Sequence, residues 1–110
     1  MNSDFIILTS ISFNKSVGRL ARKYPSLIKD LLHFKEELLA NPTNGIALGK
    51  DCYKIRMKIS SKGQGKSGGA RVITYVKINN KTITLLEIFD KSEIENITDK
   101  ELSDLLKKAI

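Results

Sequence analysis

Apolar and basic residues alternate without a break from Tyr53 to Ile59. The basic positions are Lys54, Arg56 and Lys58, and the apolar positions between them include Tyr53, Ile55 and Met57. Successive side chains of a β-strand point to opposite faces of its sheet. This period of two predicts a strand that has one apolar face for the core and one cationic face.

The same strand begins a segment that lacks acidic residues. No Asp or Glu occurs from Cys52 to Leu86, and the basic residues in that range are Lys54, Arg56, Lys58, Lys62, Lys66, Arg71, Lys77 and Lys81. The chain of 110 residues has 19 Lys and Arg against 12 Asp and Glu, a formal net charge of +7. Without these eight basic residues, the basic and acidic residues in the remainder of the chain nearly balance. Such a local surplus on a folded surface is typical of proteins that bind polyanions.

Composition and length predict a single globular domain over residues 1–110. Hydrophobic residues make up 41% and charged residues 28%, which separates the chain from disordered proteins. No apolar run reaches the length of a membrane span, and the first residues lack the basic region of a signal peptide. The lone Cys52 cannot form an internal disulfide and fits a reducing compartment. We therefore expect a cytoplasmic domain.

The remaining pattern predicts the element order β-α-α-β-β-β-α. Residues 4–9 are an apolar run, expected to be a strand buried on both faces or nearly so. Apolar residues at helical spacing predict one helix after an N-cap at Ser12, and a second over 26–40 with Leu27, Ile28, Leu31 and Leu32 in its stripe. Residues 43–50 contain two glycines and predict a loop.

The second half of the chain predicts a three-stranded meander and a last helix. Strands are expected over about 53–59, 71–78 and 82–89, with Asn79-Asn80 as the hairpin turn because Asn tolerates positive φ. Thr98 and Glu101 form a capping box before a terminal amphipathic helix. The predicted class is α+β, with a helical hairpin packed on a twisted, mainly antiparallel four-stranded sheet. The other sheet face would present the cationic strand face, flanked by the terminal helix.

The glycine-rich connection from residue 60 to 69 resembles phosphate-binding motifs by letter only. Dinucleotide and P-loop motifs both require a helix next, and here a predicted strand follows. We interpret it as a basic loop whose Lys62 and Lys66 contact phosphate, together with Lys58. Tyr75 and Phe89 are candidates for stacking against bases, and core packing is the alternative for Tyr75.

Metal and cofactor chemistry find no support in the sequence. His33 stands alone on a predicted helix, and Cys52 has no Cys or His neighbour at ligand spacing. We therefore expect no metal, no cofactor and no two-histidine ribonuclease mechanism.

Three segments of the chain resemble the RelE family of bacterial toxins, and with the element order they span nearly the whole length. They are residues 53–56, Tyr-Lys-Ile-Arg; residues 69–75, Gly-Ala-Arg-Val-Ile-Thr-Tyr; and residues 88–93, Ile-Phe-Asp-Lys-Ser-Glu. The resemblance implies a toxin that is inhibited by an antitoxin protein and that cuts mRNA in the ribosome. The related ParE branch shares the fold and inhibits DNA gyrase instead.

The resemblance also implies site residues. Lys54 and Arg56 match the family's basic pair, Arg71 its phosphate-binding arginine, and Lys91 the basic end of the last strand. Metal-free cleavage by the ribose 2′-OH needs a base, an acid and a stabiliser of phosphate charge. We expect Lys54 as base, Lys91 as acid and Arg71 as stabiliser, since a guanidinium fork suits phosphate oxygens.

The best-studied branch of the family carries an arginine and then a tyrosine after the last strand. The sequence departs from it here, because the matching region contains Ser92 and Thr98 and no tyrosine. The leading hypothesis is a ribosome-dependent mRNA endonuclease. A gyrase inhibitor and a non-catalytic nucleic-acid-binding module are the alternatives, because phosphate contacts alone give affinity without chemistry.

Overall fold

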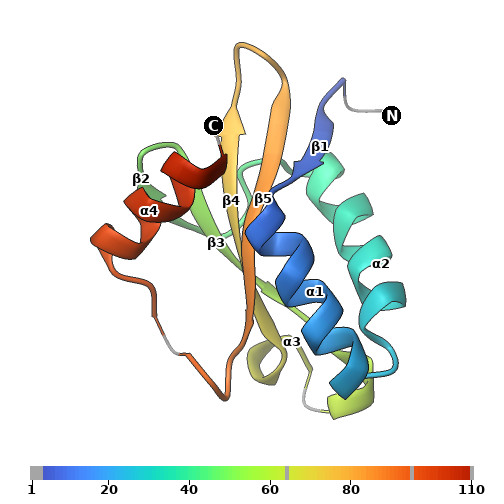
Figure 1. Cartoon of the computed structure of the whole chain (residues 1–110). Coiled ribbons are helices and arrows are strands. Elements are labelled where there is room, and N and C mark those ends of the chain that lie inside the picture. The colour runs from blue at the N-terminus through green and yellow to red at the C-terminus, as the bar shows by residue number, and fades with distance from the viewer. Residues whose placement is uncertain (1–3, 64, 95, 110) are drawn as a thin grey trace.

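The structure is a computed structural model that describes residues 4–63, 65–94 and 96–109. Within these residues, five strands form one sheet in the order β1-β5-β4-β3-β2 (Figure 1). The strands are β1 (Ile6–Thr9), β2 (Ile46–Gly49), β3 (Cys52–Met57), β4 (Ala70–Lys77) and β5 (Thr82–Asp90). β1 is parallel to β5, and the other pairs are antiparallel. The predicted α+β class and the β3-β4-β5 meander are confirmed.

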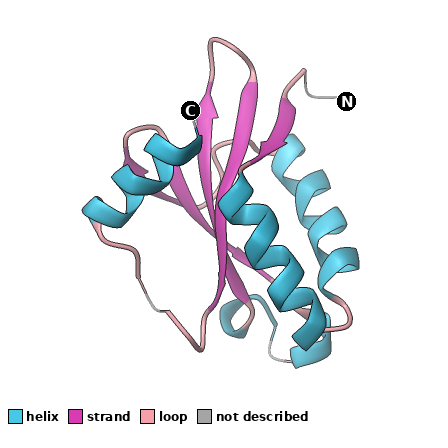
Figure 2. Ribbon diagram, viewed as in Figure 1, coloured by secondary structure: helices cyan, strands magenta, loops and turns pink. Residues whose placement is uncertain are grey.

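Helices lie on both faces of this sheet (Figure 2). The long helices are α1 (Ile11–Lys23), α2 (Leu27–Ala40) and α4 (Asp99–Ala109). The glycine-rich connection between β3 and β4 contains two short turns, η1 (Ser60–Lys62) and α3 (Gly65–Gly68). We call the face covered by α1 and α2 the hairpin face, and the opposite one the second face.

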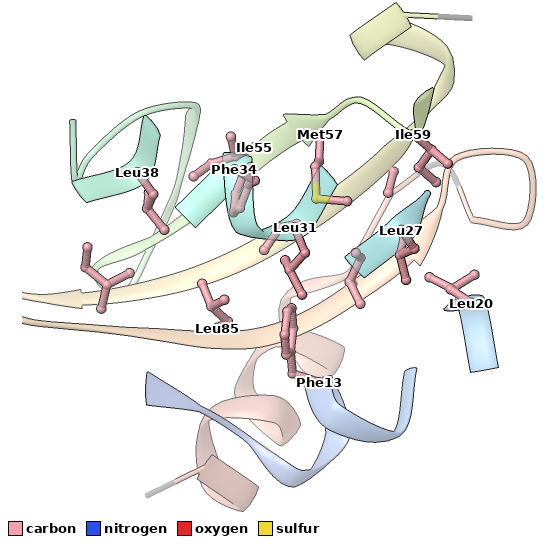
Figure 3. Close-up of a cluster of buried hydrophobic side chains, with 14 of the residues drawn as sticks. Phe13, Leu20, Leu27, Leu31, Phe34, Leu38, Ile55, Met57, Ile59 and Leu85 are labelled. Carbon is pink, nitrogen blue, oxygen red and sulfur yellow. The ribbon is translucent and has the colours of Figure 1, made fainter. Parts of the chain in front are cut away.

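The main core lies between the hairpin face and the two helices (Figure 3). Each fully buried Leu or Phe side chain there contributes about 1.5–3 kcal/mol. The start of α1 is fixed by Ser10 rather than by Ser12. The Ser10 Oγ accepts the Phe13 N–H at 3.0 Å and donates to the Leu86 carbonyl at 2.8 Å. The helical contribution to this core comes from Phe13, Leu20, Leu27, Leu31, Phe34 and Leu38.

A smaller cluster on the second face holds α4 against the sheet. Its buried members are Cys52, Ile73, Leu86, Phe89 and Leu102. The predicted capping box is confirmed, because the Glu101 N–H donates to the Thr98 Oγ1 at 3.1 Å and the Thr98 N–H donates to the Glu101 carboxylate at 2.9 Å. The second face is thus partly apolar and covered by α4.

Besides the N-cap of α1, four further details of the prediction are wrong. β1 is an edge strand, and its Ile6 is 61% exposed, so its apolar run does not signal burial. Residues 46–49 form the fifth strand, β2, where the glycines suggested a loop. Ile28 and Leu32 on α2 face solvent. In the β4–β5 turn, the residue with positive φ is Lys81, at 52°. Neither Asn79 nor Asn80 adopts positive φ.

Candidate active site

Four basic side chains line one pocket on the second face. Lys54 and Arg56 come from β3, Arg71 from β4 and Lys91 from the turn after β5. The pocket has a volume of about 490 Å³, and no Asp or Glu is among the described residues that line it. The structure thus brings together the four residues that the sequence suggested for catalysis. We call this the cationic pocket; its other lining residues are Asn44, Gly45, Ile46, Ile55 and Asn96.

The strand register places two arginines side by side on the pocket floor. Arg56 and Arg71 are directly opposite each other in the β3–β4 pair. Arg71 is only 7% exposed and donates a hydrogen bond to the Ala70 carbonyl at 3.1 Å, whereas Arg56 is exposed. Burial, and next the charge of Arg56, lower the pKa of the Arg71 guanidinium. Arginine still remains cationic at neutral pH, so an anion in the pocket meets two adjacent guanidinium charges.

Lys54 is held in the pocket by a residue that the sequence did not suggest. Its Nζ donates to the Asn96 Oδ1 at 2.9 Å. Asn96 belongs to the connection between β5 and α4, and no local pattern marks it. Among the described residues, Arg56 and Lys91 take part in no hydrogen bond or ion pair through their side chains.

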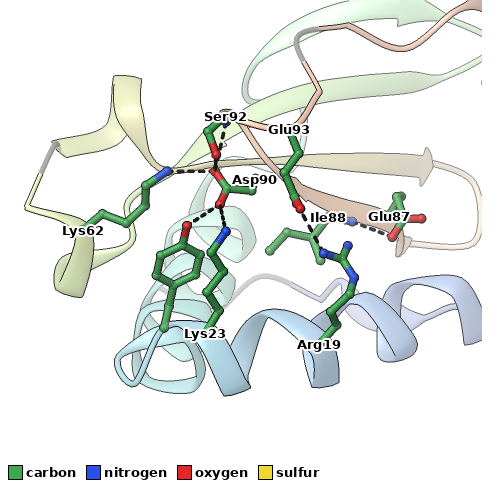
Figure 4. Close-up of polar contacts among 9 residues, drawn as sticks. Arg19, Lys23, Lys62, Glu87, Ile88, Asp90, Ser92 and Glu93 are labelled. Atoms are coloured by element: carbon green, nitrogen blue, oxygen red, sulfur yellow. Dashed lines mark hydrogen bonds and ion pairs between the residues drawn. The ribbon is translucent and has the colours of Figure 1, made fainter.

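A buried carboxylate fixes the chain immediately before Lys91 (Figure 4). The Asp90 side chain is fully buried on the hairpin face and accepts hydrogen bonds from Lys62 Nζ at 2.8 Å, from the backbone and hydroxyl of Ser92, and from the Tyr24 hydroxyl. Burial alone would raise the pKa of Asp90, but the hydrogen bonds from Lys62, Tyr24 and Ser92 outweigh it and hold the pKa well below its usual range. These hydrogen bonds join the end of β5 to the end of α1 and to the glycine-rich connection between β3 and β4.

The residues predicted to bind RNA lie elsewhere. Lys62 has an internal carboxylate partner in place of the expected phosphate, and its side chain is 10% exposed. Phe89 is 3% exposed inside the second-face cluster, and Tyr75 is half-buried against the same cluster. Lys58 is exposed and lines a separate groove beside α2. The side chain of Lys66 lies outside the described residues.

In the described part of the chain, no three His, Cys, Asp or Glu side chains gather as metal ligands would. No described helix is long and apolar enough to cross a membrane. The cationic pocket is lined by ammonium and guanidinium groups, which bind phosphate and stabilise negative charge.

Fold and pocket together define a small α+β protein with a cationic site on the exposed part of its sheet. The sequence model of the RelE toxin of the RelE/RelB toxin–antitoxin system matches residues 11–110, and the chain belongs to this family. A solved structure of a double arginine-to-alanine mutant of the E. coli toxin RelE, in its free state, is similar in fold. It is 19% identical, with a TM-score of 0.56 over 99% of this chain and 95% of that one. The chain is therefore a toxin whose partner is an antitoxin protein.

Proposed function

We propose that this toxin is an endoribonuclease that cuts mRNA on translating ribosomes, in the cytoplasm. The observation that supports it most is the convergence of Lys54, Arg56, Arg71 and Lys91 in one pocket. RNA carries its own nucleophile, the ribose 2′-OH. A protein that cuts it needs only to transfer protons and to stabilise the charge that develops on the phosphate.

In the proposed step, the 2′-oxygen bonds to the adjacent phosphorus and the bond from phosphorus to the 5′-oxygen breaks. Lys54, in its amine form, takes the proton of the 2′-OH, and Lys91 gives a proton to the leaving 5′-oxygen. Arg71, with Arg56 beside it, stabilises the negative charge on the phosphate oxygens. The products are a 2′,3′-cyclic phosphate and a free 5′-OH. Asn96 keeps Lys54 in the pocket through the 2.9 Å hydrogen bond.

The test is cleavage of a defined mRNA on translating ribosomes, with the new ends mapped and their 5′ groups identified. Wild-type toxin should produce 5′-OH ends, and a 2′-deoxy nucleotide at the cut position should abolish them. Arg71→Ala should slow cleavage by about 10²–10³-fold, the typical effect of removing one donor that stabilises a transition-state anion. The matched control is Lys77→Ala, an exposed cation at the far end of the same strand, which should keep full activity.

Two other outcomes would contradict the proposal. Gyrase-linked DNA breaks with intact mRNA would make the protein a gyrase inhibitor. RNA binding that weakens steeply with salt but yields no cut would make it a non-catalytic binding module. Full cleavage by folded Arg71→Ala, with folding checked by thermal unfolding, would remove Arg71 from the mechanism.

A further inference from the structure

An exposed isoleucine lies at the rim of the cationic pocket. Ile46 is 59% exposed and lines the same pocket as the four cations. It is directly opposite Lys54 in the β2–β3 pair, so both side chains project from the second face. A single exposed isoleucine is ordinary on protein surfaces. This one places apolar surface beside the groups that would hold a phosphate, which is where the base or sugar of a bound nucleotide must lie.

The backbone at Gly45, immediately before β2 begins at Ile46, lies tightly against β3. Gly45 has a φ of 99°, and a Cβ added to it would lie 2.4 Å from the Lys54 carbonyl oxygen and 2.7 Å from the Ile55 Cγ1. No residue other than glycine fits between this segment and the strand. The backbone on either side of Gly45, at Asn44 and Ile46, is therefore held close to β3, so little backbone freedom remains there to be lost when a ligand binds.

The aromatic side chains expected to stack on bases do not line this pocket. Phe89 is buried in the second-face cluster, and Tyr75 packs against that cluster. Among the described lining residues, Ile46 and Ile55 are the apolar side chains, and Ile55 is 3% exposed in the main core. Ile46 is thus the apolar surface that remains available to a nucleobase.

Two amide side chains also line the pocket, and they are not equivalent. The Asn96 Oδ1 accepts from Lys54, whereas Asn44 makes no side-chain hydrogen bond with any other described residue. A side-chain amide presents a donor and an acceptor side by side, the combination that reads the edge of an unpaired base. Asn44 offers this combination next to Ile46, on the opposite side of Gly45.

We infer that Asn44 and Ile46 form the base-recognition wall of the cationic pocket. Ile46 contacts the face of a nucleobase beside the bound phosphate, and Asn44 hydrogen-bonds its edge. This assignment rests on the proposed RNA substrate and adds the part of the site that distinguishes one nucleotide from another. The cations then supply affinity that is independent of sequence, as phosphate contacts do, and the wall supplies base preference.

The experiment measures binding of short single-stranded 2′-fluoro RNAs, which lack the nucleophile, by fluorescence anisotropy at several salt concentrations. Oligonucleotides that differ in one base are compared for each variant. Ile46→Ser should weaken binding roughly fivefold, somewhat less than the loss of a stacked base, without changing the salt dependence. Asn44→Ala should reduce the differences in affinity among the four bases. Arg56→Gln should lower the slope of log Kd against log salt by about one, equally for all bases.

The matched control is Ile78→Ser, which alters an equally exposed isoleucine in the β4–β5 turn, outside the cationic pocket. It should bind like the wild type. Wild-type base discrimination in both wall variants, or no base discrimination in the wild type, would overturn the inference even if the toxin cleaves mRNA. Loss of antitoxin binding by Ile46→Ser with unchanged RNA binding would make Ile46 a protein contact and would overturn it too. If the wall variants lose base discrimination but the wild-type toxin never cleaves mRNA, the endonuclease proposal is contradicted and the inference about the wall stands.

Discussion

Arg56 and Arg71 lie directly opposite each other on adjacent antiparallel strands. Like charges in such a pair destabilise a sheet, by roughly 0.2–1 kcal/mol. Arg71 is also almost fully buried, and both burial and its neighbour lower its pKa. The repulsion between the two guanidinium groups is thus an unfavourable contribution to the sheet, and an anion bound beside both of them would offset it.

Replacement of Arg56 by glutamine should stabilise the fold while weakening the proposed activity. Arg56→Gln removes the repulsion and should raise the free energy of unfolding by about 0.2–1 kcal/mol at low salt. The gain should shrink at high salt, because mobile ions screen the repulsion. Urea unfolding at two salt concentrations measures it. Lys54→Gln is the control, and it should not raise the free energy of unfolding, because Lys54 is opposite Ile73 and not opposite a cation in the β3–β4 pair. Equal gains in stability for both variants would contradict the prediction.

The buried carboxylate should matter more to stability than an exposed one. Asp90→Asn leaves the largely buried Lys62 without its charge partner and should cost about 3–5 kcal/mol of unfolding free energy. Glu93→Gln breaks an exposed pair with Arg19 at 3.3 Å and should cost no more than about 1 kcal/mol. Adding Lys62→Met to Asp90→Asn should recover part of the loss. Similar losses of unfolding free energy for Asp90→Asn and Glu93→Gln, measured by urea unfolding, would contradict the larger contribution expected of Asp90.

The same carboxylate should make stability depend on pH in the acid range. The pKa of Asp90 is lowered in the folded state, and so is that of Asp30, where hydrogen bonds from Ser60 and Ser26 outweigh the effect of burial. A carboxyl with a lowered folded-state pKa contributes stability above its unfolded-state pKa, near 4, and loses it as the pH falls further. Unfolding free energy should therefore drop below about pH 4. The drop should be smaller in Asp30→Asn; an unchanged pH profile would rule out this contribution.

Two glycines should respond in opposite ways to alanine. A Cβ on Gly69 would lie 2.2 Å from the Met57 carbonyl oxygen, so Gly69→Ala must move backbone at the start of β4. We expect a loss of about 1–3 kcal/mol in unfolding free energy, typical of overpacking, and weaker cleavage because Arg71 follows closely. Gly18 lies inside α1 with nothing within 4 Å of an added Cβ, so Gly18→Ala should gain about 0.5–1 kcal/mol. Thermal melts of the two variants that shift in the same direction would contradict this comparison.

The sequence was sufficient to predict those features that depend on local periodicity. Alternation along β3 assigns Lys54 and Arg56 to one face, and an antiparallel neighbour with Arg71 on the matching face then places the three cations together. The capping box of α4 depends on Thr98 and Glu101, which are only three residues apart. Such features need no knowledge of the remainder of the chain.

The features that were missed depend on contacts between distant segments. A register shift between Ile73 and Thr74 leaves Leu86 without a partner on β4. This bulge reverses the alternation for the rest of β5, so Phe89 turns to the second face and Asp90 to the hairpin face. The partner of Asp90, Lys62, comes from the glycine-rich connection, for which the sequence predicts a basic loop that contacts phosphate. No local pattern encodes either event.

The pairing of β1 with β5 determines when the sheet can form during synthesis of the chain. β1 cannot pair until β5 has been synthesised, because the described residues that pair with β1 lie at 82–85. The pocket needs Lys91 and Asn96 as well. A chain that ends before residue 82 therefore lacks both the strand that pairs with β1 and two of the residues that line the cationic pocket. Neither the five-stranded sheet nor the pocket can be completed until β5 and the segment after it have been synthesised.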